Sequence, residues 1–120
     1  MTENQNTVEI LLNMPRGTTT WRNNVGLCVY NKHGRRWTVK YGLCDGSSDR
    51  IGLTKITITP EMIGRTMGIF TAIEIKTETG SRRKKQKHFI EFLKNAGCIA
   101  LFATNSEDVK RAIDEFKTRG

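Results

Sequence analysis

The 120-residue sequence contains no apolar run near the roughly 20 residues that a membrane-spanning helix needs. Residues 1–6 are polar and acidic and offer no apolar segment for a signal peptide. Cysteine is scarce: Cys28, Cys44 and Cys98 form no Cys-x-x-Cys pair, and only two histidines accompany them. We therefore expect an intracellular, non-secreted protein with reduced and buried cysteines, and neither a disulfide framework nor a zinc site.

Positive charge, by contrast, is abundant. Twenty Lys and Arg against twelve Asp and Glu give a net charge of +8, which indicates a polyanionic partner. Charge alone does not separate DNA, RNA and an acidic membrane. The chain is long enough for one hydrophobic core but not for two, so we expect a single domain over residues 1–120.

Hydrophobic periodicity and turn residues predict a mixed α/β chain. The expected elements are a helix at 7–14, hairpin strands at 20–30 and 36–43, a strand at 49–59, a single helical turn at 59–64, a strand at 69–77, a helix at 82–96, a strand at 98–103 and a final helix N-capped by Ser106. The strand, helix and strand from 69 to 103 form one βαβ crossover. No repeat, linker or low-complexity segment interrupts this order.

The strand at 69–77 carries a carboxylate and an ammonium two residues apart. Strand side chains alternate, so Glu74 and Lys76 share one face while Ile73 and Ile75 fill the other. A Mg²⁺-dependent hydrolase of phosphodiesters needs hard oxygen ligands and a positive group near the phosphate, and this pair supplies one of each. The alternative is an ordinary half-exposed strand whose polar face meets water.

Gln86 lies at the edge of the apolar stripe of the helix that follows this strand. Because that helix starts just after the carboxyl end of the strand, its first turns should overhang Glu74 and Lys76, which is where ligands of open α/β sheets usually bind. Gln86 would there orient water or phosphate. Its alternative interpretation is a surface glutamine that borders the core.

Five basic residues crowd the start of the same helix, where the helix dipole disfavours cations. They are Arg82, Arg83, Lys84, Lys85 and Lys87. Backbone phosphate explains the cluster economically, because clustered cations and a helix N-terminus attract the same anion. A solvated basic face is the alternative.

Asp49 follows the small residues Gly46-Ser47-Ser48 and precedes an apolar strand. A carboxylate at such a strand start could complete a metal site with Glu74. A lone Asp in this context is otherwise a turn residue.

Taken in order, Asp49, Glu74-Ile75-Lys76 and Gln86 resemble the PD-(D/E)XK nuclease superfamily, and their surroundings resemble its virus-type replication-repair nuclease (VRR-NUC) domain. The similar passages are Trp21 to Gly26, Gly46 to Asp49, Phe70 to Thr77 with Gly80, Gln86 to Phe89, and Gly97 with the strand after it. This resemblance implies one VRR-NUC-like nuclease domain over residues 1–120, with a central mixed β-sheet flanked by helices.

Site roles follow from the same resemblance. Asp49 and Glu74, with the main-chain carbonyl of Ile75, would bind Mg²⁺ or Mn²⁺, and Glu9 would contribute through water. Lys76 would position or activate the attacking water, and Gln86 would support that site. The expected DNA contacts are Arg22, Arg82, Arg83, Lys84, Lys85 and Lys87. Ser48 departs from the family, where many members have Pro before the Asp.

The function implied is a metal-dependent DNA endonuclease, structure-specific and similar to Holliday-junction resolvases. Its partners would be branched DNA and a second copy in a homodimer, with no membrane, and a phage or mobile-element origin would place it in recombination or repair in the cytoplasm of a bacterial host. The alternatives are a non-catalytic or partner-dependent DNA-binding module and a flap or duplex nuclease of the same superfamily. A sequence-specific restriction-type enzyme is disfavoured, because 120 residues leave little room for a recognition appendage.

Overall fold

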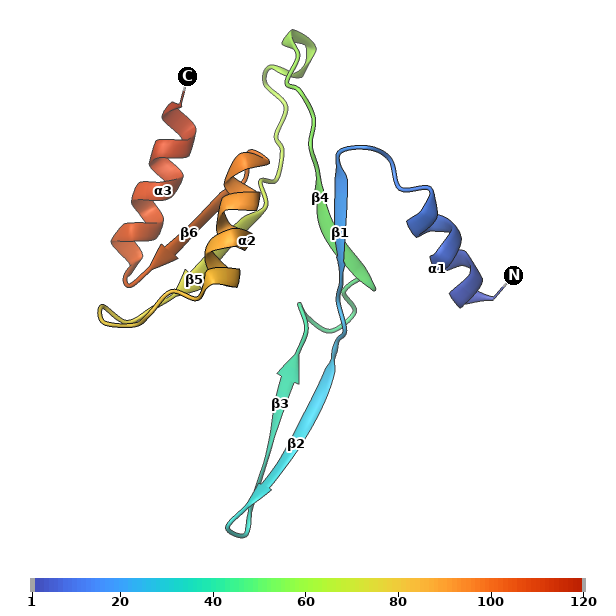
Figure 1. Cartoon of the computed structure of the whole chain (residues 1–120), viewed down its shortest axis with the longest axis vertical. Helices are drawn as coiled ribbons and strands as arrows, with labels where there is room; N and C mark the ends of the chain where they lie inside the picture. The colour runs from blue at the N-terminus through green and yellow to red at the C-terminus, as the bar shows by residue number, and fades with distance from the viewer. Residues whose placement is uncertain (1, 120) are drawn as a thin grey trace. The chain divides into compact units, whose positions relative to one another are not determined.

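The computed structural model describes residues 2–119, which divide into two compact units, one ending at Ile56 and the other beginning at Thr57. Figure 1 labels their helices and strands. The described chain is a mixed α/β protein whose strands form three two-stranded sheets, β1 with β4, β2 with β3 and β5 with β6. The α/β character is as expected, while a single central sheet is not confirmed. None of the helices described combines the length and the apolar character needed to span a bilayer.

The first unit contains one helix and two antiparallel strand pairs. Its elements are α1 (Glu3–Leu12), β1 (Thr18–Arg22), β2 (Gly26–Lys32), β3 (Arg35–Tyr41) and β4 (Arg50–Thr54). In the β1–β4 pair Thr20 lies opposite Gly52, and in the β2–β3 pair Tyr30 lies opposite Trp37. The second pair is the hairpin labelled at β2 and β3 in Figure 1.

Helix α1 begins earlier than the predicted 7–14, because Thr2 caps its start. The Thr2 hydroxyl accepts a hydrogen bond from the Gln5 N–H at 3.1 Å, and the Gln5 side chain accepts one from the Thr2 N–H at 2.8 Å. This reciprocal pair is a capping box, which satisfies two backbone donors at a helix start. The helix therefore starts at Glu3 and ends at Leu12.

The predicted strand at 20–30 is in fact two strands with different partners. It breaks between Arg22 and Gly26, so β1 pairs with β4 and only β2 pairs with β3. The hairpin itself is confirmed. Its turn has two residues with positive φ, His33 at 52° and Gly34 at 73°, which is the type I′ geometry that suits the twist of a hairpin.

The second unit is built on a parallel βαβ crossover. Its elements are η1 (Pro60–Met62), β5 (Thr71–Ile75), α2 (Lys84–Asn95), β6 (Ile99–Ala103) and α3 (Ser106–Thr118). Strands β5 and β6 are parallel, with Glu74 opposite Phe102, as the crossover predicts. The single turn after Thr59 is confirmed as η1.

The core of the second unit lies where α2 and α3 contact β6. Its buried residues are Ile90, Leu93, Ala100 and Ala103. Leu93 is fully buried, and small residues of β6 leave room for it. Burying a leucine side chain contributes roughly 2 kcal/mol, so this contact is a principal source of stability in the unit.

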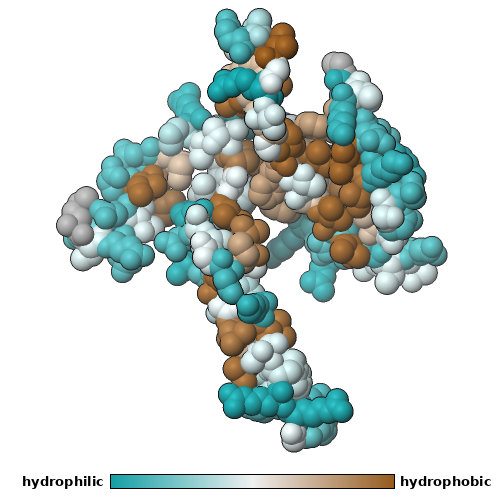
Figure 2. Space-filling model, turned by 180° about the vertical axis from the view of Figure 1, so that it is seen from behind, coloured by the Kyte–Doolittle hydropathy of each residue, from teal (hydrophilic) through white to brown (hydrophobic). Residues whose placement is uncertain are grey.

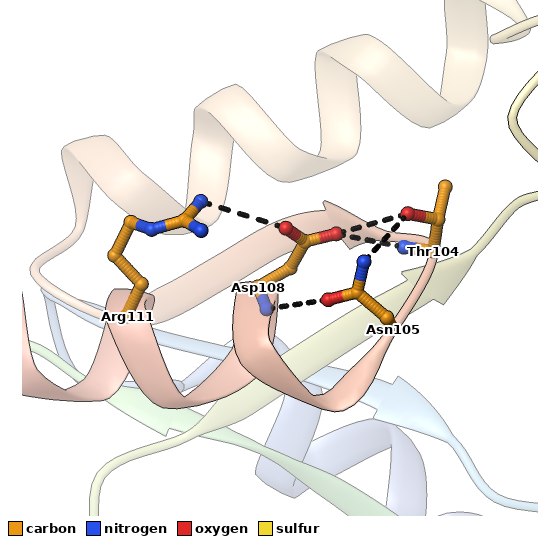
Figure 3. Close-up of polar contacts among 4 residues, drawn as sticks. All are labelled: Thr104, Asn105, Asp108 and Arg111. Carbon is orange, nitrogen blue, oxygen red and sulfur yellow. Dashed lines mark hydrogen bonds and ion pairs between the residues drawn. The ribbon is translucent and has the colours of Figure 1, made fainter.

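Helix α3 starts at a polar network shown in Figure 3. Asn105 is the N-cap, one residue before the predicted Ser106, and its Oδ1 accepts a hydrogen bond from the Asp108 N–H at 3.0 Å. The Asp108 carboxylate in turn accepts from the Thr104 N–H at 3.0 Å and lies 3.5 Å from the Arg111 guanidinium. The Thr104 N–H is the main cause that holds the pKa of Asp108 below its ordinary value, because it stabilises the charged form.

The cysteines are free, as expected, but none of the three is fully buried, contrary to the prediction. Cys28 and Cys44 are exposed, and Cys98 is half-buried. Desolvation raises the pKa of the Cys98 thiol, so this cysteine should be the least reactive of the three. Both exposed cysteines belong to the first unit, which has no buried residue among positions 2–56 to form a core around them.

Candidate functional site

Glu74 and Lys76 share one face of β5, but burial on this strand is the reverse of the prediction. Their side chains are 37% and 17% exposed, whereas Ile73 is 42% and Ile75 is 78% exposed. The prediction that Ile73 and Ile75 fill the other face of the strand as buried residues is therefore wrong. The polar face instead meets Gln86 of α2, which donates a hydrogen bond to the Glu74 carboxylate.

Gln86 connects the start of α2 to Glu74. Its Oε1 accepts a hydrogen bond from the Arg83 N–H, the N-cap backbone group, at 3.1 Å. Its Nε2 donates to Oε1 of Glu74 at 2.7 Å. Because the amide oxygen is held by the helix terminus, the amide nitrogen is directed at the carboxylate. Gln86 is therefore placed to orient Glu74.

Lys76 extends the same cluster from the end of β5. Its Nζ lies 3.7 Å from Oε1 of Glu74, a distance that gives Coulomb attraction but is too long for a direct hydrogen bond. The Lys76 N–H donates to the Ala103 carbonyl at 2.9 Å, which anchors its backbone to β6. The ammonium is thus held beside the carboxylate on a fixed strand.

The carbonyl of Ile75 points to the edge of β5 that does not face β6. Backbone bonds between the strands use Phe70, whose carbonyl accepts from the Ile99 N–H, and Lys76, whose N–H donates to Ala103. In a parallel ladder the residues between such positions direct their backbone groups to the opposite side. Ile75 therefore offers a carbonyl oxygen one residue away from the carboxylate of Glu74.

The basic residues before and within the first turn of α2 are all exposed. Arg82 differs from the others, since its guanidinium carbon lies 4.6 Å from the centre of the Phe102 ring. A cation over an aromatic face is attracted by the ring quadrupole, so Arg82 has a contact of its own on β6. Arg83, Lys84, Lys85 and Lys87 project from the same short segment.

Asp49 lies in the first unit, at the start of β4, and a network centred on Asn23 holds the turn before it. The Asn23 side chain accepts from the Leu43 N–H at 3.0 Å and donates to the Ser47 hydroxyl and the Ser48 carbonyl, each at 2.8 Å. The Asn23 N–H also donates to the Asp49 carbonyl at 2.7 Å. Asn23 thus fixes the backbone on both sides of this turn, while the Asp49 side chain is exposed.

The role of Asn23 was missed by sequence reasoning, although a signal for it exists. Asn23 directly follows a strand, and the chain contains a Gly-Ser-Ser turn elsewhere. Asparagine side chains often satisfy backbone groups outside regular structure. The signal is weak, because nothing local tells which turn Asn23 contacts.

Glu9 and Arg22 are also exposed residues of the first unit. Glu9 lies on α1, where its Oε1 is 3.4 Å from Nδ2 of Asn13. Arg22 ends β1 opposite Arg50, whose own guanidinium contacts Thr20. The structure therefore gathers Glu74, Lys76 and Gln86 in the second unit, while Asp49, Glu9 and Arg22 belong to the first.

The oxygen donors suit a hard divalent cation. Glu74 supplies a half-buried carboxylate and Ile75 a neighbouring carbonyl, and oxygen ligands of this kind are those that Mg²⁺ and Mn²⁺ prefer. Within residues 2–119 no three His, Cys, Asp or Glu side chains are grouped closely enough to hold a metal ion. A metal bound here would therefore need main-chain carbonyl and water ligands as well.

Comparison with known proteins gives one match. The family model of the VRR-NUC domain matches residues 2–107, which is nearly the whole chain. Searches of the curated proteins and of the solved structures gave no match.

Proposed function

The chain belongs to the VRR-NUC domain family, and we propose that it is a divalent-metal-dependent DNA endonuclease that prefers branched DNA. VRR-NUC domains are nucleases, so phosphodiester hydrolysis and DNA binding are the general function of this family. The family also implies a PD-(D/E)XK fold, and with it a central sheet. Beyond this general function, we propose that the enzyme depends on a divalent metal, prefers branched DNA and forms a homodimer.

The observation that supports it most directly is the cluster of Glu74, Lys76 and Gln86. A carboxylate oriented by an amide at 2.7 Å, with an ammonium 3.7 Å away, is a costly arrangement for a strand face. Charged and polar groups are often held together, partly away from water, where charge develops in the transition state of a reaction.

Asp49, Glu74 and the carbonyl of Ile75 would hold Mg²⁺ or Mn²⁺, with Glu9 contributing through water. The ion, when bound, would neutralise charge on the scissile phosphate and lower the pKa of water. Gln86 would keep Glu74 in the rotamer that presents its carboxylate to the site. The Asn23 network would hold the backbone that carries Asp49.

Lys76 would act at the phosphate. Its side chain is only 17% exposed, and its ammonium lies 3.7 Å from Glu74, close to any group that docks beside that carboxylate. There Nζ would donate hydrogen bonds to the attacking water or to a non-bridging phosphate oxygen, and its charge would offset the charge that develops in the transition state. A half-sheltered ammonium is more effective in this role than one in bulk water.

DNA backbone would lie along Arg83, Lys84, Lys85 and Lys87, with Arg82 and Arg22 as further contacts. The exposed cations at the start of α2 follow the strand that bears Glu74, so phosphates next to the scissile bond would reach them. Contacts of this kind position the substrate without reading its sequence. Paired active sites in a homodimer would suit two symmetric cuts in a four-way junction.

Cleavage of labelled four-way junction, flap, single-stranded and plain duplex DNA, each with Mg²⁺, Mn²⁺ or EDTA, tests the proposal. We expect metal-dependent cutting of the junction, reduced at least about a hundredfold in Lys76→Ala with DNA affinity nearly unchanged. Lys94→Ala, an exposed lysine in the last turn of α2, is the matched control and should cut normally. Faster cutting of flap or duplex DNA would support a nuclease whose preferred substrate is not the junction. If Lys76→Ala lost DNA affinity and turnover equally, the role proposed for Lys76 would be refuted.

A non-catalytic DNA-binding module is the second candidate, because a cluster of three acidic, His or Cys ligands is absent from residues 2–119. Titration of the free protein with Mn²⁺ separates the two. Saturable binding that Asp49→Asn and Glu74→Gln both weaken supports the nuclease. Tight DNA binding with neither metal binding nor cutting supports the binding module.

A further inference from the structure

The β2–β3 hairpin has one aromatic face that extends along its length. Pairing places Cys28 opposite Val39, and Tyr30 opposite Trp37, on the same face. The rings of Tyr30 and Trp37 stack with centroids 5.5 Å apart and planes at 16°. Tyr41 joins this face, because a Cβ at position 26 would overlap its ring, so the ring lies across β2 over Gly26.

The aromatic face ends in a pair of cations at the tip. Lys32 lies opposite Arg35, two residues beyond Tyr30 and Trp37 and therefore on the same face. Arg36 lies opposite Asn31 on the other face. The hairpin from Gly26 to Tyr41 contains no Asp or Glu. Figure 2 shows this arm as hydrophobic along its middle and hydrophilic at its end.

These rings remain open to a partner. Tyr30, Trp37 and Tyr41 are between 44% and 46% exposed, and every residue of the hairpin from Leu27 to Tyr41 is exposed. A stacked pair of rings with a third ring on the same face and cations at its end suits unpaired bases, with π-faces for the bases and positive charge for the backbone. The cations and the lack of acidic groups favour a polyanion over a cationic or a neutral apolar partner.

We propose that this aromatic face of the hairpin binds single-stranded DNA. Bases stack on the open sides of Trp37, Tyr30 and Tyr41, and Lys32 and Arg35 contact the adjoining phosphates. In duplex DNA the bases are already stacked on one another, so a duplex can use only the cations. The inference rests on the proposed function in taking DNA as the partner, and it assigns the hairpin to the unpaired strand near a branch.

Equilibrium binding in EDTA, where no metal-dependent cutting occurs, tests the inference apart from catalysis. A labelled oligothymidylate is the single-stranded probe and a blunt duplex of equal length is the comparison. Trp37→Thr should weaken single-strand binding about tenfold, since stacking on one ring contributes about 1–3 kcal/mol, and should leave duplex binding unchanged. Trp37→Phe should retain most of the single-strand affinity of the wild type, because phenylalanine keeps a π-face.

Two matched controls lie on the opposite face of the same strands. Val29→Thr removes an exposed apolar residue there and should leave both affinities unchanged. Arg35→Gln should lower the salt dependence of single-strand binding by about 0.7 in the log-log slope for one lost phosphate contact, while Arg36→Gln should not. An unchanged single-strand affinity in Trp37→Thr, or equal losses in Val29→Thr, would overturn the inference.

Tryptophan emission keeps the inference testable if Trp37→Thr does not fold. In Trp21→Phe the remaining signal comes from Trp37, because the chain has two tryptophans. Oligothymidylate should quench this emission and slow the alkylation of Cys28, which lies on the same face, but not that of Cys44. Unquenched emission would overturn the inference.

A dimer seen in analytical ultracentrifugation would also overturn the inference if Trp37→Phe left it intact and Trp37→Thr dissociated it, because a second copy of the chain would then cover the aromatic face. Loss of cutting alone would count against the proposed nuclease and not against the hairpin.

Discussion

The two units stabilise their functional residues by different means. In the second unit, α2 and α3 pack on β6 around a fully buried Leu93, and the Glu74 cluster lies beside this packed frame. In the first unit no residue from 2 to 56 is buried, and the backbone near Asp49 is held by hydrogen bonds to Asn23. Hydrophobic packing therefore stabilises the unit that carries Glu74, and polar contacts hold the backbone beside Asp49.

This contrast has a consequence for how each unit should respond to mutation. Burial of apolar surface contributes more per residue than a solvent-accessible hydrogen bond. Damage to the packed unit should therefore appear as lost global stability. Damage to the first unit should appear as local loosening, with a smaller effect on the whole.

Leu93→Ala should give the largest effect. Removing a fully buried leucine costs about 2–5 kcal/mol of unfolding free energy, because a cavity replaces packed atoms. Leu12→Ala, with a leucine 79% exposed on α1, is the matched control and should cost less than about 0.5 kcal/mol. Urea denaturation measures both. Similar costs for the two variants would break the comparison, because α1 would then be as tightly packed as α2.

Gln86→Ala should reduce turnover about ten- to a hundredfold, the usual cost of losing a residue that orients a metal ligand. The reason is the lost 2.7 Å hydrogen bond to Glu74, so the metal concentration needed for half-maximal cutting should rise as well. DNA affinity should stay the same. His88→Ala, on an exposed position of α2, serves as the control. A turnover loss without any change in metal dependence would mean that Gln86 acts otherwise than through Glu74.

Asn23→Ala should cost about 1 kcal/mol, less than the sum of its hydrogen bonds, because water can replace part of them. Hydrogen exchange should speed up at Leu43 and Cys44, whose N–H groups lie in the Asn23 network. The neighbouring, exposed Asn24→Ala is the control. Exchange rates that rise equally throughout both units would contradict a local role.

The smallest effect is expected at the start of α3, from the charge of Asp108. The pKa of this carboxyl is lowered in the folded protein, chiefly by the Thr104 N–H, so its stabilising effect is complete above the unfolded value of about 3.9. It is lost as the pH falls through the lower folded pKa. Wild type should therefore melt slightly above Asp108→Asn at pH 7, and the two should converge once the pH lies below the lowered folded pKa of this carboxyl. A gap that persists at low pH would show that charge is not the cause, and Asp114→Asn should show no gap at either pH.

Several features could be predicted because they depend on local pattern. The parallel βαβ unit, the hairpin and the single turn at Pro60 follow from periodicity, glycine and proline. The grouping of Glu74 with Lys76 follows from strand alternation, and the family follows from Asp49, Glu74-Ile75-Lys76 and Gln86 in order. The roles of Asp49, Glu9 and the basic residues stay predictions.

Other features depend on contacts between distant residues, which no local pattern reveals. The break between β1 and β2, the pairing of β1 with β4, and the contact of Asn23 with residues 43–48 are of this kind. So is the reversed burial of β5, where Gln86 of α2 contacts Glu74 and Ile75 is exposed.

The amino-acid sequence by itself determined the family, the charge and most of the order of the helices and strands, because side-chain chemistry and spacing are written along the chain. Only the tertiary structure decided which oxygen Gln86 contacts, which face of β5 is sheltered and which rings of the hairpin stay open. The physical reason is that burial and hydrogen-bond partners are properties of residues brought together from different elements, and alternation along one strand does not say which face another element will cover.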